Sequence, residues 1–77
     1  MNAYGYSKIN EVSVQIETEM VPCGGGLYTE MAVFGIVWLE TEDGIFEVTP
    51  LIGETEDYLA AHYRKTGLTD NRCVFFK

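Results

Sequence analysis

The sequence predicts an α+β domain in which one helix packs against one face of a four-stranded, mainly antiparallel sheet. Two observations support this prediction. Three stretches rich in β-branched and aromatic residues come first, and a single amphipathic stretch with helix-start and helix-end signals follows them. A short apolar stretch closes the chain, so the predicted order is β-β-β-α-β. A chain of 77 residues is expected to form one small domain, 1–77, with a correspondingly small core.

The first predicted strand covers 8–21, where polar and apolar side chains alternate with a period of two. Its apolar face carries Val12, Val14, Ile16 and Met20. A proline and three consecutive glycines then break the alternation, so we expect 22–26 to be a loop that joins antiparallel strands.

The central strand is predicted over 27–40, the longest near-continuous apolar run in the chain. Asp43-Gly44 follows it, and this dipeptide is typical of a two-residue hairpin turn. We therefore expect the chain to return along the central strand as a third strand over 45–49.

One helix is predicted over 54–66. Acidic residues crowd its start, Arg64 and Lys65 lie near its end, and Gly67 follows as a left-handed cap, an order that complements the helix dipole. Its apolar stripe is formed by Tyr58, Leu59, His62 and Tyr63. A right-handed crossover would then place the last strand, 72–76, parallel to the third.

The register of the first hairpin decides which face of the central strand is buried. With Met20 opposite Tyr28, the face under the helix carries Ala32, Phe34, Ile36 and Trp38. The opposite face is also apolar, because it carries Met31, Val33, Val37 and Leu39, with Phe46 and Val48 from the third strand. One helix cannot cover both faces, so the second face needs the N-terminal arm, a second copy or a partner. Within the chain, the aromatic residues that could fold over it are Tyr4, Tyr6 and Phe75 or Phe76.

The net charge of −7 lies entirely in the first two thirds of the chain. Residues 1–53 contain eight acidic side chains and one lysine, whereas 54–77 contain four of each sign. Direct binding to nucleic acid needs clustered Lys and Arg, so it is not expected, and a basic protein partner is favoured instead. The simpler interpretation is that the acidity only keeps a small protein soluble.

No residue pattern predicts catalysis, a metal centre or a cofactor. The single histidine, His62, lies in the middle of the predicted helix, and neither CxxC nor HxxxH spacing is present. Ser7 and Ser13 have no histidine or acid at a recognisable spacing. The carboxylates lie on predicted solvent faces, without the apolar pocket that would raise the pKa of a catalytic acid or base. We therefore expect no enzymatic activity.

The N-terminus lacks a basic region followed by an apolar one, and no apolar run reaches the roughly 18 residues of a membrane span. We therefore expect no membrane association and a cytoplasmic location. In that compartment Cys23 and Cys73 should be free thiols, and the predicted topology places them at opposite ends of the sheet, too far apart to bridge.

The function expected from these features is that of a small acidic binding protein that occupies a basic surface of another protein. The predicted binding residues are Glu11, Glu17, Glu19, Glu30, Met31, Val33, Val37 and Leu39. In size and charge alone, the chain is typical of phage or mobile-element inhibitors of host nucleic-acid machinery, of the anti-CRISPR or anti-restriction type. The alternative is a structural or homo-oligomerising domain, such as a homodimer, whose apolar sheet face is an assembly interface.

Overall fold

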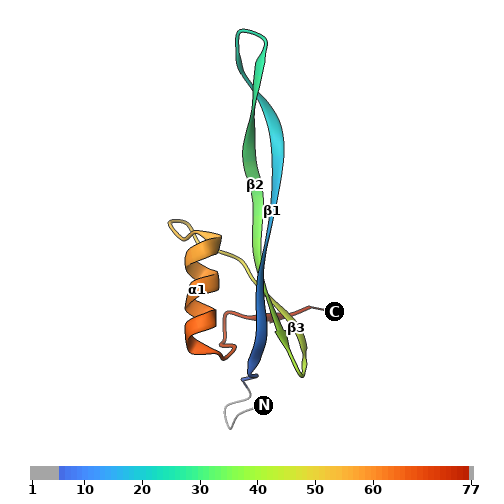
Figure 1. Cartoon of the computed structure of the whole chain (residues 1–77), viewed down its shortest axis with the longest axis vertical. Helices are drawn as coiled ribbons and strands as arrows, with labels where there is room; N and C mark the ends of the chain where they lie inside the picture. Colours follow the sequence, from blue (N-terminus) through green and yellow to red (C-terminus); the bar gives the residue numbers. More distant parts are fainter. Residues whose placement is uncertain (1–5, 77) are drawn as a thin grey trace.

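The computed structural model describes residues 6–76, apart from the side chain of Val33. The elements are β1 (Ile9–Gly24), β2 (Leu27–Thr41), β3 (Gly44–Val48), α1 (Glu56–Thr66) and β4 (Val74–Phe75) (Figure 1). The predicted α+β class, with one helix and an antiparallel sheet, is confirmed. Tyr4, one of the aromatic residues expected to fold over the second sheet face, lies outside the described residues.

The strands are hydrogen-bonded in the order β1-β2-β3-β4, and every neighbouring pair is antiparallel. An isolated antiparallel bridge between Lys8 and Leu68 adds a fifth short segment beside the start of β1. The prediction that the last strand runs parallel to the third is wrong. The Arg72 side chain donates to the Thr49 carbonyl at the end of β3, 3.1 Å away, so the chain reaches that end before β4 begins. β4 therefore runs back along β3.

The register of the first hairpin also differs from the prediction. β1 continues to Gly24, and only Gly25 and Gly26 form the turn, with φ angles of 60° and 74° that favour glycine. Because the turn is tighter, Met20 pairs with Glu30, two residues farther along β2 than the predicted partner Tyr28. Farther from the turn, Glu17 pairs with Phe34 and Thr18 with Ala32, which leaves one extra residue of β2 between the two pairs.

The extra residue, Val33, forms a β-bulge. In the part of β2 that follows it, 34–41, each side chain lies on the face opposite to the predicted one. A slip of one residue moves every side chain of a strand to the opposite face. Val14 consequently faces Val37 and Val12 faces Leu39, on the side of the sheet that packs against α1. The predicted core face is therefore wrong, and of its members only Ile36 is buried.

The core lies between the lower half of the sheet and α1. Its fully buried members are Val37, Leu39 and Val48 from the sheet and Leu59, Ala60 and Tyr63 from the helix. All six side chains are at most 1% exposed. Around them pack the partly buried residues Ile9, Val12, Val14, Phe46 and Cys73. The fold thus has one small core, as expected from its length.

The turn between β2 and β3 consists of Glu42 and Asp43, one residue earlier than predicted, because Thr41 pairs with Gly44. The Thr41 hydroxyl accepts from the Asp43 N–H and donates to the Gly44 carbonyl, which fixes this turn. Gly44 has a φ of 128°, and the ring of Phe75 lies where a Cβ atom would be. The positive φ favours glycine at this position, and any larger residue would also displace the Phe75 ring.

The helix prediction is confirmed, with a start two residues later than expected. Thr55 is the N-cap, and its hydroxyl accepts from the Tyr58 N–H at 3.1 Å. Gly67 ends the helix in the left-handed conformation, with a φ of 70°. The predicted apolar stripe is only partly buried, since Tyr58 and His62 are exposed.

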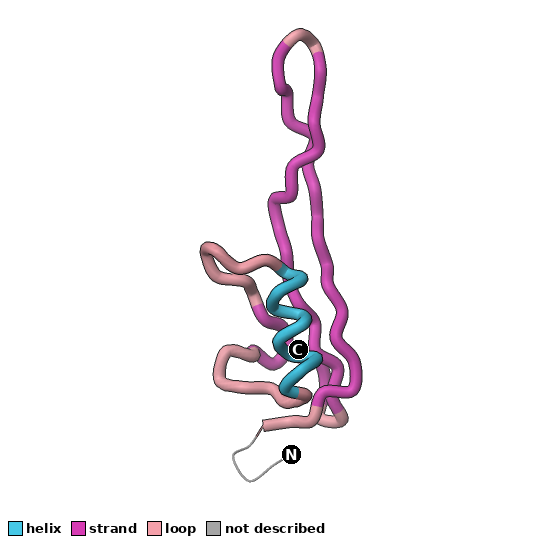
Figure 2. The backbone as a smooth tube through the Cα atoms, turned by 60° about the vertical axis from the view of Figure 1, so that its left-hand side comes forward, coloured by secondary structure: helices cyan, strands magenta, loops and turns pink. Residues whose placement is uncertain are grey.

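The molecule is elongated because the first hairpin extends far beyond the helix (Figures 1 and 2). The principal extents are 58 × 24 × 17 Å and the radius of gyration is 15.6 Å. A compact domain of this length would have a radius of gyration of about 11 Å. We call residues 16–35, which project from the core, the arm, and the remaining described residues the body.

Candidate functional site

The arm is the feature of this fold that the core does not explain. β3 pairs only with 37–41 of β2. Among residues 6–76, the part of β1 from Asn10 to Gly24 therefore has no strand partner but β2, and 27–36 has no strand partner but β1. Six large apolar side chains of the arm are between 43% and 68% exposed: Ile16, Met20, Leu27, Tyr28, Met31 and Phe34. A lone two-stranded ribbon is marginally stable in water. Exposed apolar side chains on such a ribbon mark an interaction surface.

The arm carries three glutamates and no Lys, Arg or His. The cross-strand pairs Glu17–Phe34 and Glu19–Met31 place two of these carboxylates beside apolar side chains on one side of the ribbon. Glu30 pairs with Met20 on the other side, where its carboxylate accepts from the Thr18 hydroxyl at 2.7 Å. The structure therefore brings Glu17, Glu19 and Met31 together, as the sequence predicted.

Three other predicted binding residues lie elsewhere. Val37 and Leu39 are 0% exposed in the core, so their predicted place on an open face is wrong. The bulge is the physical reason, because it turns both side chains toward α1. Val33 is the bulged residue itself, and its side chain lies outside the described part of the structure. Glu11 is exposed, but it belongs to the body, where it pairs with Glu40.

The face of the sheet opposite α1 forms a second exposed apolar surface, which the sequence prediction missed. Cross-strand pairing brings Ser13, Trp38 and Glu47 into one row and Glu11, Glu40 and Ile45 into the next. An open hollow of about 300 Å³ lies on this face and is lined by Glu11, Ser13, Trp38, Glu40, Ile45 and Phe76. We call this feature the tryptophan hollow. The sequence predicts Trp38 in the core, and the bulge places it on the open face instead.

Two contacts fix the tryptophan ring in this hollow. Its indole N–H donates to the Gln15 side-chain oxygen at 2.9 Å. The rings of Trp38 and Phe76 form a T-shaped contact, with a centroid distance of 5.1 Å and an angle of 83° between the planes. Phe76 covers this face only in part, since its side chain is 51% exposed.

No family model, curated protein or solved structure matches this chain. Within residues 6–76, no helix is long and apolar enough to cross a membrane. In the same residues, no group of three or more His, Cys, Asp or Glu side chains is placed to hold a metal ion.

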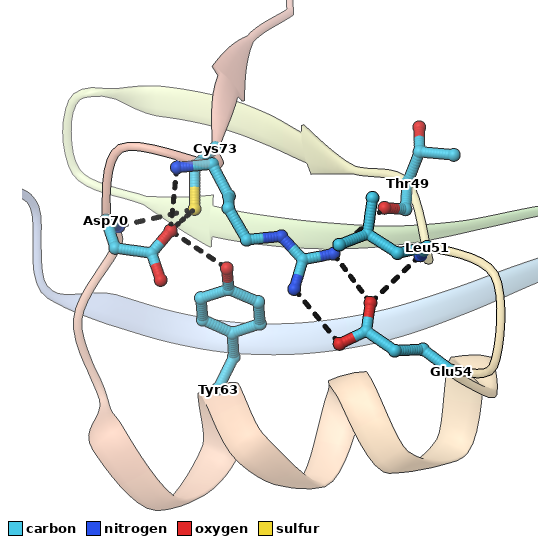
Figure 3. Close-up of polar contacts among 7 residues, drawn as sticks. Thr49, Leu51, Glu54, Tyr63, Asp70 and Cys73 are labelled. Carbon is cyan, nitrogen blue, oxygen red and sulfur yellow. Dashed lines mark hydrogen bonds and ion pairs between the residues drawn. The ribbon is translucent and has the colours of Figure 1, made fainter.

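A polar cluster joins the start of α1 to the last strand (Figure 3). The Arg72 guanidinium donates to both carboxylate oxygens of Glu54, at 2.8 and 3.1 Å, and also reaches the Thr49 carbonyl. This ion pair, with a hydrogen bond from the Leu51 N–H, lowers the pKa of Glu54 to about 2. We call this Glu54–Arg72 ion pair the latch.

The chain around Asp70 is held by a second group of contacts. The Tyr63 hydroxyl donates to the Asp70 carboxylate at 2.9 Å, and the Arg72 N–H and Cys73 thiol contact the same oxygen. Burial is the main cause that raises the pKa of both Tyr63 and Cys73. Cys73 and Cys23 are both free thiols, and Cys23 lies exposed near the tip of the arm. These contacts fix the chain that leads into the last strand.

Proposed function

We propose that this chain is a non-enzymatic interaction protein that binds a basic surface of another protein through its arm and the adjoining open face of the sheet. The observation that carries the proposal is the arm: an uncovered ribbon with six exposed apolar side chains, three glutamates and no cationic side chain. Apolar side chains surrounded by charges of a single sign are typical of an interface whose partner carries the opposite charge.

The charge pattern extends well beyond the arm. From Ile9 to Tyr63 the sequence contains eleven acidic residues and no Lys or Arg. Two-stranded ribbons also enter DNA grooves, but those that do so need cations for the phosphates, which this ribbon lacks. Carboxylates on an extended ribbon suit the reverse situation, in which they take the place of phosphates on a nucleic-acid-binding protein. The size and charge of the chain favour one form of this proposal, in which the chain inhibits a nucleic-acid-binding protein.

The second candidate is an assembly in which two arms cover one another. The observation that favours it is the pair of open strand edges on the arm, since unpaired edges are templates for strand addition. Charge opposes it, because two arms side by side would bring six glutamates together without a cation. The mass in solution at micromolar concentration separates the candidates: a monomer supports the first, and a salt-insensitive dimer supports the second.

The direct test of the proposal uses two single charge reversals. Glu19→Lys changes the arm, and Glu42→Lys makes the same change on the exposed β2–β3 turn of the body. Proteins retained from a lysate of the source organism are identified, purified and titrated against the chain by calorimetry at about 0.05 and 0.5 M salt. Losing a close charge pair at an interface costs roughly 1.5 kcal/mol or more, so Glu19→Lys should weaken binding about tenfold.

The control is expected to bind within about twofold of the wild type, because salt largely screens the effect of an exposed charge that lies outside the contact with the partner. Binding should also weaken at high salt. Equal affinities of the Glu19→Lys and Glu42→Lys variants for the purified partner would contradict the proposal.

A further inference from the structure

We infer that the tryptophan hollow is a binding site for a cationic side chain, specifically an arginine presented by the partner. This inference rests on the proposed function for its choice of a basic partner, but it concerns a different part of the surface from the arm. It assigns a role to Trp38, Phe76, Glu11 and Glu40.

The aromatic walls of the hollow are suited to a cation. Trp38 and Phe76 stand almost at right angles, at 83°, and so form a corner of two rings. Aromatic rings attract cations through their negative faces, and tryptophan does so most strongly. The hydrogen bond from the indole to Gln15 holds the Trp38 ring in place before any ligand arrives. A fixed aromatic corner reduces the entropy that a binding side chain must lose.

The carboxylates of the hollow supply the complementary charge. Glu11 and Glu40 are a cross-strand pair, so their side chains start about 5 Å apart on the same face. Within residues 6–76, neither carboxylate forms an ion pair with a Lys or Arg side chain. Two like charges directly opposite each other destabilise a sheet. A bound cation would neutralise this repulsion.

The floor of the hollow suits the rest of an arginine side chain. Ile45 is 43% exposed between the carboxylates and the aromatic corner, so it can contact the methylene groups of a ligand. Arginine is favoured over lysine because its planar guanidinium stacks on an aromatic ring and its five N–H donors can reach two carboxylates. An open hollow of about 300 Å³ accommodates one side chain rather than a folded segment.

The test is an NMR titration of the full chain with Nα-acetyl-arginine amide. The uncharged probe Nα-acetyl-norleucine amide and the singly charged Nα-acetyl-lysine amide serve as comparisons. The arginine probe should give saturable shifts of the Trp38 indole N–H and of the backbone amides at Glu11 and Ile45. An affinity of about 1 mM or weaker is expected for so small a ligand.

Three variants locate the site. Glu11→Gln and Glu40→Gln keep the shape of the hollow, and each should weaken the arginine probe at least about fivefold by removing one charge-assisted contact. Glu42→Gln removes a carboxylate outside the hollow and should leave the titration unchanged. Equal binding of the lysine or norleucine probe, or no saturable shift with the arginine probe, would overturn the assignment.

The two proposals fail separately. An arginine probe that does not bind, together with a partner that is weakened by Glu19→Lys, refutes the hollow and supports the interaction function. Equal partner affinities of Glu19→Lys and Glu42→Lys refute the proposed function, and binding of the arginine probe would then still support a cation site.

Discussion

The two halves of the first hairpin have similar apolar content but opposite environments. In the body, Leu39 packs under α1 and is 0% exposed, whereas in the arm Met31 is 54% exposed. Both lie on β2, only eight positions apart, and the bulge at Val33 lies between them. Apolar residues in a strand therefore do not by themselves indicate a core. What covers the strand decides their role, and among residues 6–76 only the body half is covered.

The largest effect expected from this difference is on stability. Leu39→Ala should lower the free energy of unfolding by about 2–5 kcal/mol, because it removes a fully buried side chain and leaves a cavity. Met31→Ala should change it by less than about 0.5 kcal/mol, since the residue contributes little to the core. Urea denaturation followed by Trp38 fluorescence measures both values. Similar losses in the two variants would mean that the arm is part of the folded core.

A smaller effect is expected at acid pH, from the latch of the body. The folded pKa of Glu54 is about 2 and its ordinary value is 4.5, so the ion pair adds stability above pH 4.5 that is lost as the pH falls toward 2. The wild type should therefore exceed Glu54→Gln in unfolding free energy at neutral pH. This difference should shrink progressively between pH 4.5 and 2.

Arg72→Gln, which removes the other member of the latch, should show the same pH-dependent difference from the wild type. Because both side chains are partly exposed, added salt should reduce the difference. Urea denaturation at a series of pH values tests this role of the latch. If the difference in unfolding free energy between wild type and Glu54→Gln stays constant from neutral pH to pH 2, the role is contradicted.

Local signals account for what the sequence predicted well. The helix ends where the basic last turn and Gly67 indicate, because caps and dipole charges act within one turn of the chain. Its acidic first turn marked the start to within two residues, since the helix begins after the Thr55 N-cap. The alternation in β1 and the apolar run in β2 predicted both strands. Between the tip of the arm and the bulge, over 18–32, the predicted side-chain parity also holds, which is why Glu19 and Met31 were correctly grouped. Glu17 lies on the same side as Glu19 because side chains alternate along β1.

Features that depend on contacts distant in sequence were not predictable in this way. Val33 is a β-branched residue in a run of similar residues, so nothing local marks it as the bulge, yet it decides which face Val37, Trp38 and Leu39 occupy. The direction of the last strand likewise depends on Arg72 reaching Thr49 and Glu54, far away in the sequence. The tryptophan hollow was missed for the same reason, since it exists only on the face that the bulge exposes.

The central claim is that the arm is uncovered in the free protein and is available for a partner. Backbone hydrogen exchange of the free chain, measured by NMR amide by amide, tests it most directly. The amides of β3, α1 and the body half of β2 should exchange slowly, near the limit set by global unfolding. Amides over 18–32 should exchange far faster, through local opening of a ribbon that nothing covers. Equal protection of the arm and the body would contradict this account.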